Sequence, residues 1–469
     1  MSAAAPPHLG ASVSTARTLG AEARADSRVR STSAAALWAS LLLVTYWWMA
    51  DGGVEALGAG AEALTSIGRL TGLLAADLLL AQVLLMARLP ILERAYGRDR
   101  LVRIHRVIGF TSFNLMVAHI VLITWGYAAG QLAQSPRTLW TMTWDYPGML
   151  LAMAGTACLV LSVVTSIRAA RARMRYESWH LLHLYAYLGV GLALPHQLWT
   201  GQSFTSSQAA SIFWWGLWAA AAGSIMIWRV LLPLWRSLRH RLRVTSVVQE
   251  SSDTYSVYMT GRRLDLLQMR AGEFGVWRFL GTRGWTRANP YSLSAAPDGR
   301  SLRITVKSLG DNSGRVPRIR PGARVVLEGP YGRLTARTRT KPGVALIGAG
   351  VGVAPLRSLA EGLSYAPGDA VLLHRFSGEP LFYHELEALG RERGLRVLWL
   401  PGRRRSASSW LGDGVGDADD ATALRYWVPD IHTRDVYVCG PDDWTASVIR
   451  SCRKAGVRGD QIHIEIFGW

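Results

Sequence analysis

The residues best suited to chemistry are four histidines in two apolar segments. His105 and His119 lie fourteen residues apart in one segment, and His183 and His196 lie thirteen apart in the other. In a helix each spacing covers roughly 20 Å, because a helix rises about 1.5 Å per residue. If both helices run in the same direction, His105 shares its depth with His183, and His119 shares its depth with His196. Imidazole nitrogens from two facing helices can be the axial ligands of a haem iron, so the spacing predicts two b-type haems at different depths.

Alternatives to this interpretation stay open on the sequence alone. Histidines in membrane helices also form interhelical hydrogen bonds, although four histidines matched in depth are more typical of a functional site. His180 lies one turn before His183 and is a competing ligand. A spacing of thirteen residues departs from the phase of an ideal helix, and Pro195, directly before His196, can distort the helix there.

A glycine-rich segment supplies a second kind of chemistry. Residues 344–355 predict a buried strand, then a glycine loop, then the start of a helix. Backbone N–H groups and the positive end of a helix suit a pyrophosphate, so this segment predicts a dinucleotide site. It departs from the GxGxxG fingerprint, because a proline stands where a small residue is usual and no acidic residue stands out on the next strand. The candidate residues are Gly348, Gly350, Gly352 and Pro355.

A third candidate site is a segment with the residues Arg287, Pro290, Tyr291 and Ser292. An arginine beside a tyrosine and a serine can bind a flavin phosphate, while the tyrosine ring packs on the isoalloxazine. Residues 307–313 and 328–332 follow with further Lys, Ser, Gly and Tyr residues. The order and spacing of the three pieces predict a site for FAD.

Six apolar segments must position the histidines, at about 35–50, 68–88, 104–127, 147–167, 180–199 and 209–232. Arginines cluster before the first segment and after the second, fourth and sixth, whereas the alternate connections hold only Arg69 and Arg137. By the positive-inside rule, this predicts six membrane-spanning helices with both termini in the cytoplasm. We therefore expect a multi-pass protein of a bacterial cell membrane, with the lipid bilayer as its surroundings.

Charge and cysteine content exclude other classes. A net charge of +19 with a pI near 10.5 often indicates nucleic acid, but here the arginines flank apolar segments, which favours a membrane and no nucleic-acid partner. The three scattered cysteines cannot supply the thiolates of an iron–sulfur cluster or a CxxC zinc site. Any redox cofactor must therefore be held by other residues.

The pattern along the chain predicts a multidomain protein with four parts. Residues 1–34 are predicted to be a disordered cytoplasmic tail, and residues 35–235 a six-helix transmembrane haem bundle. Strands at 243–260, 272–279, 302–308 and 323–328 predict an antiparallel β-barrel for FAD over residues 236–340. Alternating strands and helices from 370 to 455 predict an α/β domain with a parallel sheet for NAD(P)H over residues 341–469.

Together these motifs resemble the ferric reductase and NADPH oxidase superfamily, in which a six-helix haem domain is fused to a ferredoxin–NADP reductase-type module. The resemblance covers residues 35–469 and rests on the paired histidines, the RxxPYS-like segment, the GxGxGxxP segment, Cys439-Gly440-Pro441 and the C-terminal aromatic, in the family's order. Tyr176-Glu177, ahead of His183, also resembles the family and favours His183 over His180 as the ligand.

The resemblance implies roles for the residues of the FAD site. FAD would be bound by Arg287, Tyr291 and Ser292. Lys307 and Ser313 would lie near its phosphates. An aromatic residue at the C-terminus would cover the flavin ring, and Phe467 and Trp469 compete for this role.

The resemblance also implies how the dinucleotide is held. The glycine segment would bind its pyrophosphate, with Cys439 and Gly440 beside the nicotinamide. Arg375 follows the second strand of the nucleotide domain, where related oxidases place an arginine on the 2′-phosphate of NADPH. Arg403, Arg404 and Arg405 are further candidates, and a solvated basic loop is the alternative, so NADPH or NADH stays open.

The implied function is electron transfer across the membrane. Electrons would pass from cytoplasmic NAD(P)H through FAD and two b-type haems to an extracytoplasmic acceptor. A ferric chelate or a general small-molecule acceptor is favoured, and a superoxide-producing NADPH oxidase is the alternative. A membrane-anchored flavin reductase without haem is a hypothesis of another class, and a partner protein stays open.

Overall fold

The computed structural model describes residues 20–58, 60–174, 176–281, 288–310, 313–415 and 418–466. The chain divides into two compact units. The helical unit contains Val29–Leu92 and Asp99–Arg229. The sheet unit contains Met1–Arg28, Glu93–Arg98 and Val230–Trp469.

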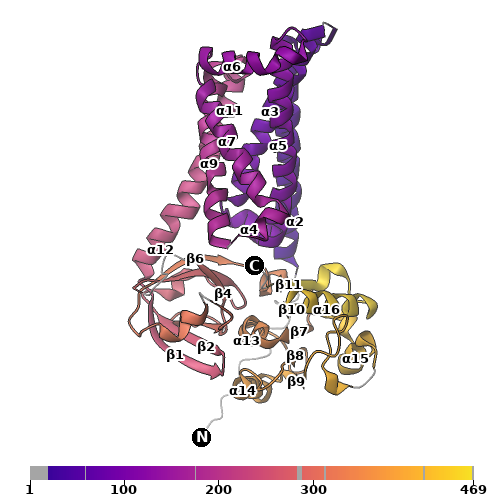
Figure 1. Ribbon diagram of the computed structural model, residues 1–469. Helices are drawn as coiled ribbons and strands as arrows, with labels where there is room; N and C mark the ends of the chain where they lie inside the picture. Colours follow the sequence, from indigo (N-terminus) through magenta and orange to yellow (C-terminus); the bar gives the residue numbers. More distant parts are fainter. Residues whose placement is uncertain are drawn as a thin grey trace. The chain divides into compact units, whose positions relative to one another are not determined.

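Six helices of 17 to 30 residues form the main part of the helical unit (Figure 1). They are α2 (Ala21–Trp48), α3 (Gly60–Met86), α5 (Arg98–Tyr127), α7 (Met149–Ser166), α9 (Tyr176–Trp199) and α11 (Gln208–Ser224). Short elements connect them: η1 (Met49–Gly53), η2 (Glu55–Gly58), α4 (Pro90–Tyr96), η3 (Leu132–Gln134), α6 (Ser135–Asp145), α8 (Arg168–Arg171) and α10 (Gln202–Thr205). After α11 the helix continues through η4 (Ile225–Leu231) into α12 (Leu232–His240).

Among the described residues, five helical segments are long and apolar enough to cross a membrane. They are Ala21–Gly53, Gly60–Met86, Arg98–Tyr127, Met149–Ser166 and Gln208–His240. Helix α9 is also long enough, but it contains three histidines and further polar residues that lower its mean hydropathy. The count of six spans therefore stays a prediction.

One predicted boundary is wrong. The disordered tail was expected to extend to residue 34, but α2 begins at Ala21. This segment is rich in alanine and arginine, which favour helix. Its acidic side chains also form ion pairs inside the sheet unit, Glu22 with Arg270 and Asp26 with Arg337. Intrinsic propensity and these pairs together explain why residues 21–34 are ordered.

Helices α7 and α9 pack with their backbones in contact. A Cβ atom added at Gly155 would meet the carbonyl oxygen of Gly189 at 2.7 Å, and one added at Gly189 would meet that of Gly155 at 2.8 Å. Only glycine allows this approach, which is typical of helix pairs in membranes. The contact fixes the position of α9, which carries two of the four candidate ligands.

The first part of the sheet unit contains two antiparallel sheets of three strands. One has the order β1 (Arg243–Ser251), β2 (Thr254–Thr260), β5 (Ser301–Lys307), and the other β4 (Asn289–Ser292), β3 (Phe274–Phe279), β6 (Val325–Tyr331). Isolated bridges join the sheets at Leu293 with Ile304 and at Arg243 with Arg324. The predicted strand segments are confirmed, whereas closure into a barrel stays a prediction.

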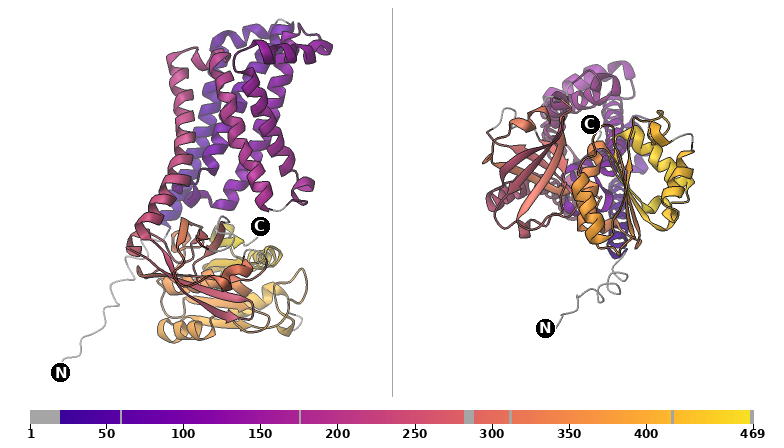
Figure 2. Two further views of the ribbon diagram at one scale, coloured as in Figure 1. Left: turned by 60° about the vertical axis from the view of Figure 1, so that its left-hand side comes forward. Right: turned by 90° about the horizontal axis from the view of Figure 1, so that it is seen from below.

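The second part contains a five-stranded parallel sheet, as predicted. Its order is β11 (Ile462–Ile466), β10 (Asp435–Gly440), β7 (Val344–Ala349), β8 (Ala370–Arg375), β9 (Arg396–Leu400). Helices α13 (Val353–Gly362) and α14 (Tyr383–Arg393) pack on one face, and α15 (Asp420–Trp427) and α16 (Asp442–Lys454) on the other (Figure 2). The buried strands β7 and β10 form its centre, so the loop after β7 lies at the carboxyl edge of a rigid sheet.

Buried ion pairs join the two parts of the sheet unit. The guanidinium group of Arg303 on β5 donates two hydrogen bonds of 2.8 Å to the carboxylate of Glu385 on α14. Arg357 on α13 pairs with the same carboxylate at 2.7 Å and with Glu361 at 2.6 Å. Two buried arginines and two acidic residues therefore hold the antiparallel sheets against the parallel-sheet domain.

Candidate functional site

The structure brings the four histidines together in the two predicted pairs. The ring centres of His105 and His183 lie 6.0 Å apart, and those of His119 and His196 lie 6.5 Å apart. One member of each pair comes from α5 and the other from α9. Helix α9 continues through Pro195, and the spacing of thirteen residues still brings His196 to His119.

These separations fit a metal ion between the two rings of each pair. A metal–nitrogen bond is about 2 Å long, and an imidazole nitrogen lies roughly 1 Å from its ring centre. Two imidazoles on opposite sides of one metal therefore have ring centres about 6–7 Å apart. Both pairs lie in this range. Ligation also requires an unprotonated Nε2 on each ring, which the hydrogen bonds at Nδ1 can test.

In the His119–His196 pair, the contacts at Nδ1 leave Nε2 free on both rings. His119 Nδ1 lies 2.8 Å from the carbonyl oxygen of Gly68, which can only accept a hydrogen bond. The Thr200 hydroxyl donates to the carbonyl oxygen of His196 at 2.7 Å, so it accepts from His196 Nδ1 at 2.5 Å. In the neutral form each ring then carries its hydrogen on Nδ1 and a lone pair on Nε2.

Space for His119 depends on a glycine of α3. A Cβ atom added at Gly72 would meet His119 Nδ1 at 2.5 Å. Nothing in the sequence marks Gly72 for this role, because a glycine in a membrane helix more often serves close helix packing.

His183 has the same arrangement, through Ser166 at the end of α7. Ser166 Oγ lies 3.2 Å from His183 Nδ1. The Ser166 hydroxyl also donates to the carbonyl oxygen of Ser162 at 2.7 Å, and in that arrangement its oxygen accepts from His183 Nδ1–H. For His105, the other member of this pair, Nδ1 is buried. The donor sets of both pairs thus fit haem iron.

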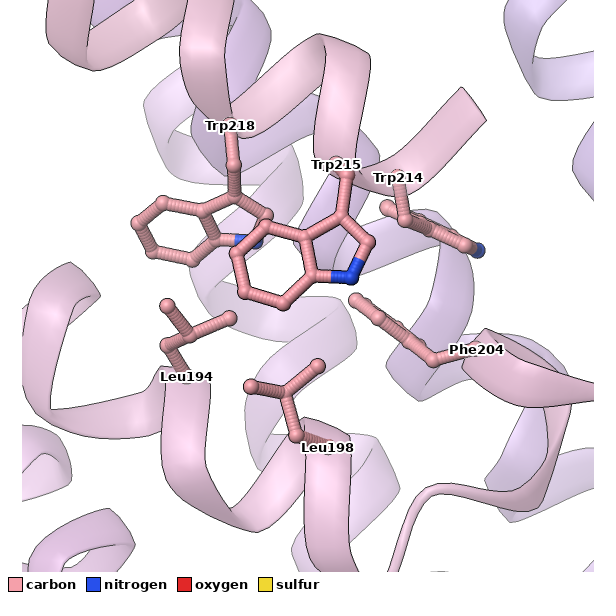
Figure 3. A pocket seen from close by; sticks show the side chains of 6 residues that line it. All are labelled: Leu194, Leu198, Phe204, Trp214, Trp215 and Trp218. Atoms are coloured by element: carbon pink, nitrogen blue, oxygen red, sulfur yellow. The ribbon is translucent and has the colours of Figure 1, made fainter. Parts of the chain in front are cut away.

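An apolar hollow lies beside the part of α9 that carries His196 (Figure 3). Leu194 and Leu198, which flank His196 in the sequence, form one wall. Phe204 of α10 stacks on Trp214 of α11 with ring centres 4.1 Å apart. Trp215 and Trp218 complete the lining. The residues that line this hollow include no metal-ligating group.

Part of the predicted FAD segment lies on β4. Arg287 is outside the described residues, whereas Pro290, Tyr291 and Ser292 end this strand. The backbone carbonyl of Tyr291 accepts a hydrogen bond of 2.9 Å from the Trp277 indole, which anchors the strand. Burial raises the pKa of Tyr291 to about 12, so its hydroxyl stays protonated. Ser292 Oγ is buried without a partner among the described residues, and a phosphate oxygen would satisfy it.

The other two predicted FAD residues have partners within the chain. Lys307 forms an ion pair of 3.3 Å with Asp253, and both side chains are exposed enough for this pair to be weak. Ser313 Oγ accepts a hydrogen bond of 2.9 Å from the backbone N–H of Leu309. Their place near the phosphates of FAD stays a prediction.

The glycine segment has the geometry of a backbone anion site. Gly348 is the second-to-last residue of β7. Gly350 begins the tight turn η8 (Gly350–Gly352) with φ +53°, and helix α13 begins at Val353. Pro355 stands in the first turn of α13, where a missing backbone N–H leaves no helical hydrogen bond unmade. The start of a helix leaves backbone N–H groups without intrahelical partners, and such groups suit a pyrophosphate.

Gly352 cannot accept a side chain, and Gly352→Ala should weaken NADPH binding about tenfold. A Cβ atom there would collide with the backbone of β10, at 2.8 Å from the carbonyl carbon of Cys439 and 3.0 Å from Gly440 N. The central strand cannot move aside, so the loop must, at a cost of about 1–3 kcal/mol. Gly414→Ala, where a Cβ atom meets nothing within 4 Å, is the control. Equal dissociation constants for NADPH in the two variants would contradict the prediction.

The structure places Cys439 and Gly440 at the carboxyl end of β10. The Cys439 side chain is fully buried among apolar residues that include Val353 and Leu356. Burial, together with the charge of Glu465, raises the pKa of this thiol well above its usual range, which argues against a thiolate nucleophile. Its position beside a nicotinamide stays a prediction. Phe467 and Trp469 lie outside the described residues.

Arg375 ends β8 and hydrogen-bonds the carbonyl oxygen of Gly402 at 3.4 Å. Burial lowers its pKa, and nearby Arg404 lowers it further, so an anionic group would be favourable here. Arg404 donates to backbone carbonyls and to Ser447 Oγ at 3.0 Å, and Arg405 pairs with Asp420 at 3.3 Å. Of the four predicted arginines, Arg375 and the exposed Arg403 have the fewest hydrogen bonds to described residues of the chain, so their guanidinium groups are best suited to bind a phosphate.

Sequence reasoning did not give Arg69 a chemical role. This arginine lies in α3, in a segment long and apolar enough to cross a membrane, and donates a hydrogen bond of 3.2 Å to Ser203 Oγ. A charged residue in a membrane helix is costly and usually functional. That cost is the signal in the sequence that could have indicated a role for Arg69 beyond membrane topology.

Comparisons with known proteins agree with both units. Residues 71–194, which include three of the four histidines, match the family model "Ferric reductase like transmembrane component". The chain is 31% identical over 245 residues to a flavohemoprotein of Pseudomonas aeruginosa, covering 50% of this chain and 60% of that protein. It is 28% identical over 251 residues to a glycine betaine monooxygenase reductase subunit of Chromohalobacter salexigens, covering 51% and 67%.

Among solved structures, the flavohem-like FAD/NAD-binding domain of a nitric oxide dioxygenase from Vibrio cholerae is similar, with 24% identity and a TM-score of 0.39. The match covers 49% of this chain and all of that domain. The chain spans 60% of the length of the flavohemoprotein. Part of the chain is thus similar to ferric reductase-like transmembrane components, and about half of it is similar to flavohemoproteins and to a monooxygenase reductase subunit.

Proposed function

We propose that this protein is a transmembrane oxidoreductase that passes electrons from cytoplasmic NAD(P)H, through FAD and two b-type haems, to an acceptor outside the cytoplasm. The observation that carries the proposal is the pair of histidine levels between α5 and α9, with ring centres 6.0 and 6.5 Å apart. Hydrogen bonds at Nδ1 favour a ligating Nε2 on three of these rings.

FAD, when bound, converts the two-electron chemistry of the nicotinamide into single-electron steps. The chain's own residues bind and orient the reactants. The loop Gly348–Gly352 and the start of α13 would hold the pyrophosphate, and Ser292 and Tyr291 would hold the flavin. His105 with His183, and His119 with His196, would hold the two irons.

For the acceptor we favour a ferric chelate or another small anionic acceptor. Arg69 supplies a positive charge in α3, with Ser203 as its hydrogen-bond partner. Ferric chelates carry negative groups that such a charge attracts. Dioxygen is the second candidate, because the side chains that Figure 3 shows beside this part of α9 are all aliphatic or aromatic and hold no group that would bind a chelate.

For the donor we favour NADPH over NADH. Arg375 and the exposed Arg403 lie near the carboxyl edge of the parallel sheet, where a 2′-phosphate would meet positive charge. Replacing Arg375 by glutamine should raise the KM for NADPH about tenfold and leave that for NADH unchanged. An equal change for both donors would contradict this preference.

Transfer across the bilayer can be tested in proteoliposomes with ferricyanide trapped inside and NADPH added outside. Full-length protein should reduce the trapped ferricyanide, which cannot cross the membrane itself. Reduction of external but not trapped ferricyanide would overturn the proposal and favour a membrane-anchored flavin reductase. Superoxide formed at the rate of NADPH oxidation, with ferric chelates ignored, would favour the oxidase alternative.

A further inference from the structure

Ser166 lies between helices α7 and α9, beside the candidate ligand His183. It is the last residue of α7, and α7 packs against α9 through the backbone contact of Gly155 with Gly189. Its hydroxyl lies 3.2 Å from His183 Nδ1 and 3.2 Å from the indole nitrogen of Trp179, both on α9. One hydroxyl oxygen therefore contacts a histidine and a tryptophan that are four residues apart.

The hydrogen bonds of the Ser166 hydroxyl indicate which groups donate and which accept. The single hydrogen of Ser166 goes to the carbonyl oxygen of Ser162 at 2.7 Å. The indole N–H of Trp179 can only donate, so Ser166 Oγ accepts from it. The second lone pair of the oxygen then accepts from His183 Nδ1–H. Trp179 thus holds the hydroxyl in the orientation that holds His183.

Trp179 also contacts the His183 ring directly. The two rings are stacked, with centres 5.3 Å apart and planes at 22°. The guanidinium carbon of Arg171 lies 4.2 Å from the centre of the Trp179 ring, and this cation–π contact restrains the indole in turn. The stack limits rotation of the imidazole, and the hydrogen bond through Ser166 fixes its tautomer. These are two independent restraints on one ring.

We infer that Trp179 and Ser166 are positioning residues that set the ring orientation and the donor strength of His183 toward haem iron. The inference rests on the haem ligation in the proposed function. A hydrogen bond from Nδ1–H makes the opposite nitrogen a stronger electron donor and so stabilises the ferric state. Loss of this bond therefore shifts the potential of the haem held by His105 and His183 to a more positive value.

Three substitutions separate the two restraints. Ser166→Ala removes the hydroxyl oxygen that contacts His183 Nδ1. Trp179→Phe keeps an aromatic ring for stacking and removes the indole donor, whereas Trp179→Ala removes both. Thr200→Val is the matched control, because Thr200 is the hydroxyl acceptor for His196 in the other pair.

Full-length protein with both haems should be examined by redox titration of the optical bands and by electron paramagnetic resonance. Ser166→Ala should raise the midpoint potential of one haem by up to the equivalent of a tenfold change in its oxidised-to-reduced ratio, about 59 mV for one electron. Trp179→Phe should shift the same haem less, and Trp179→Ala should also broaden its g values. Thr200→Val should shift only the other haem.

The inference is overturned if Ser166→Ala and both Trp179 variants leave both potentials and all g values unchanged. It is also overturned if they shift the haem that Thr200→Val shifts. A wild-type protein without b-type haem bands would overturn the proposed function and this inference together, and that outcome is visible before any variant is made.

Discussion

Replacement of His183 by alanine should give a protein that binds one haem instead of two and still reduces its flavin with NADPH. The ring of His183 lies 6.0 Å from that of His105, so the substitution removes one of the two rings that would hold a haem at this level. The His119–His196 pair keeps both of its rings and its contacts at Nδ1. We expect reduction of trapped ferricyanide to fall at least 100-fold, since outer-shell changes alone cost about 10–100-fold.

His180→Ala is the matched control for this prediction. His180 lies one turn earlier on α9 and its ring centre lies 6.4 Å from that of Trp179. This variant should keep two haems per chain and most of the transfer rate. Haem per chain, measured after extraction, and flavin reduction, measured by anaerobic stopped flow, distinguish the variants. Loss of haem in His180→Ala, with both haems retained in His183→Ala, would show that His180 is the ligand and would contradict the prediction.

Replacement of Glu385 by glutamine should destabilise the sheet unit by about 3 kcal/mol. The carboxylate accepts two hydrogen bonds of 2.8 Å from Arg303, whose side chain is only 6% exposed. Removing one partner of a buried pair leaves an uncompensated charge, which costs about 3–5 kcal/mol. We expect the lower end, because the Glu385 side chain is 34% exposed and Glu361 still pairs with Arg357.

This loss should depend on pH. Burial alone would raise the pKa of Glu385, but the hydrogen bond from Arg303 and the charge of Arg357 outweigh it, so the pKa lies below its usual 4.5. A carboxylate of this kind stabilises the fold above its unfolded pKa, and the contribution is lost as the pH falls through its folded pKa. The difference between wild type and Glu385→Gln should therefore be constant above pH 4.5 and shrink below it.

Urea-induced release of FAD from full-length protein in detergent measures this effect. Glu392→Gln is the control, because Glu392 is exposed on the same helix and should change stability by at most about 0.5 kcal/mol. Equal urea midpoints for the Glu385 and Glu392 variants would contradict the prediction.

The pairing of the histidines could be predicted because it depends on local geometry. Helical rise and the shared direction of two helices are enough to place His105 with His183 and His119 with His196. The strand–loop–helix of residues 344–355 and the parallel sheet around it followed in the same way from local pattern.

Features that depend on contacts between distant segments could not be predicted. Ser166 is seventeen residues from His183, and nothing in its sequence context marks it as the acceptor. Gly72 makes room for His119 from another helix, and Arg303 meets Glu385 across 82 residues. The helical start at Ala21 was missed because its ion pairs, with Arg270 and Arg337, are also far away in the chain.

The central claim is that the two histidine pairs hold haems that NADPH can reduce. The most direct test is the visible spectrum of purified full-length protein, taken without oxygen before and after NADPH, with haem and FAD counted per chain. We predict two b-type haems and one FAD per chain, with both haems reduced after NADPH is added. A protein that binds FAD and oxidises NADPH but shows no b-type haem bands would contradict the account.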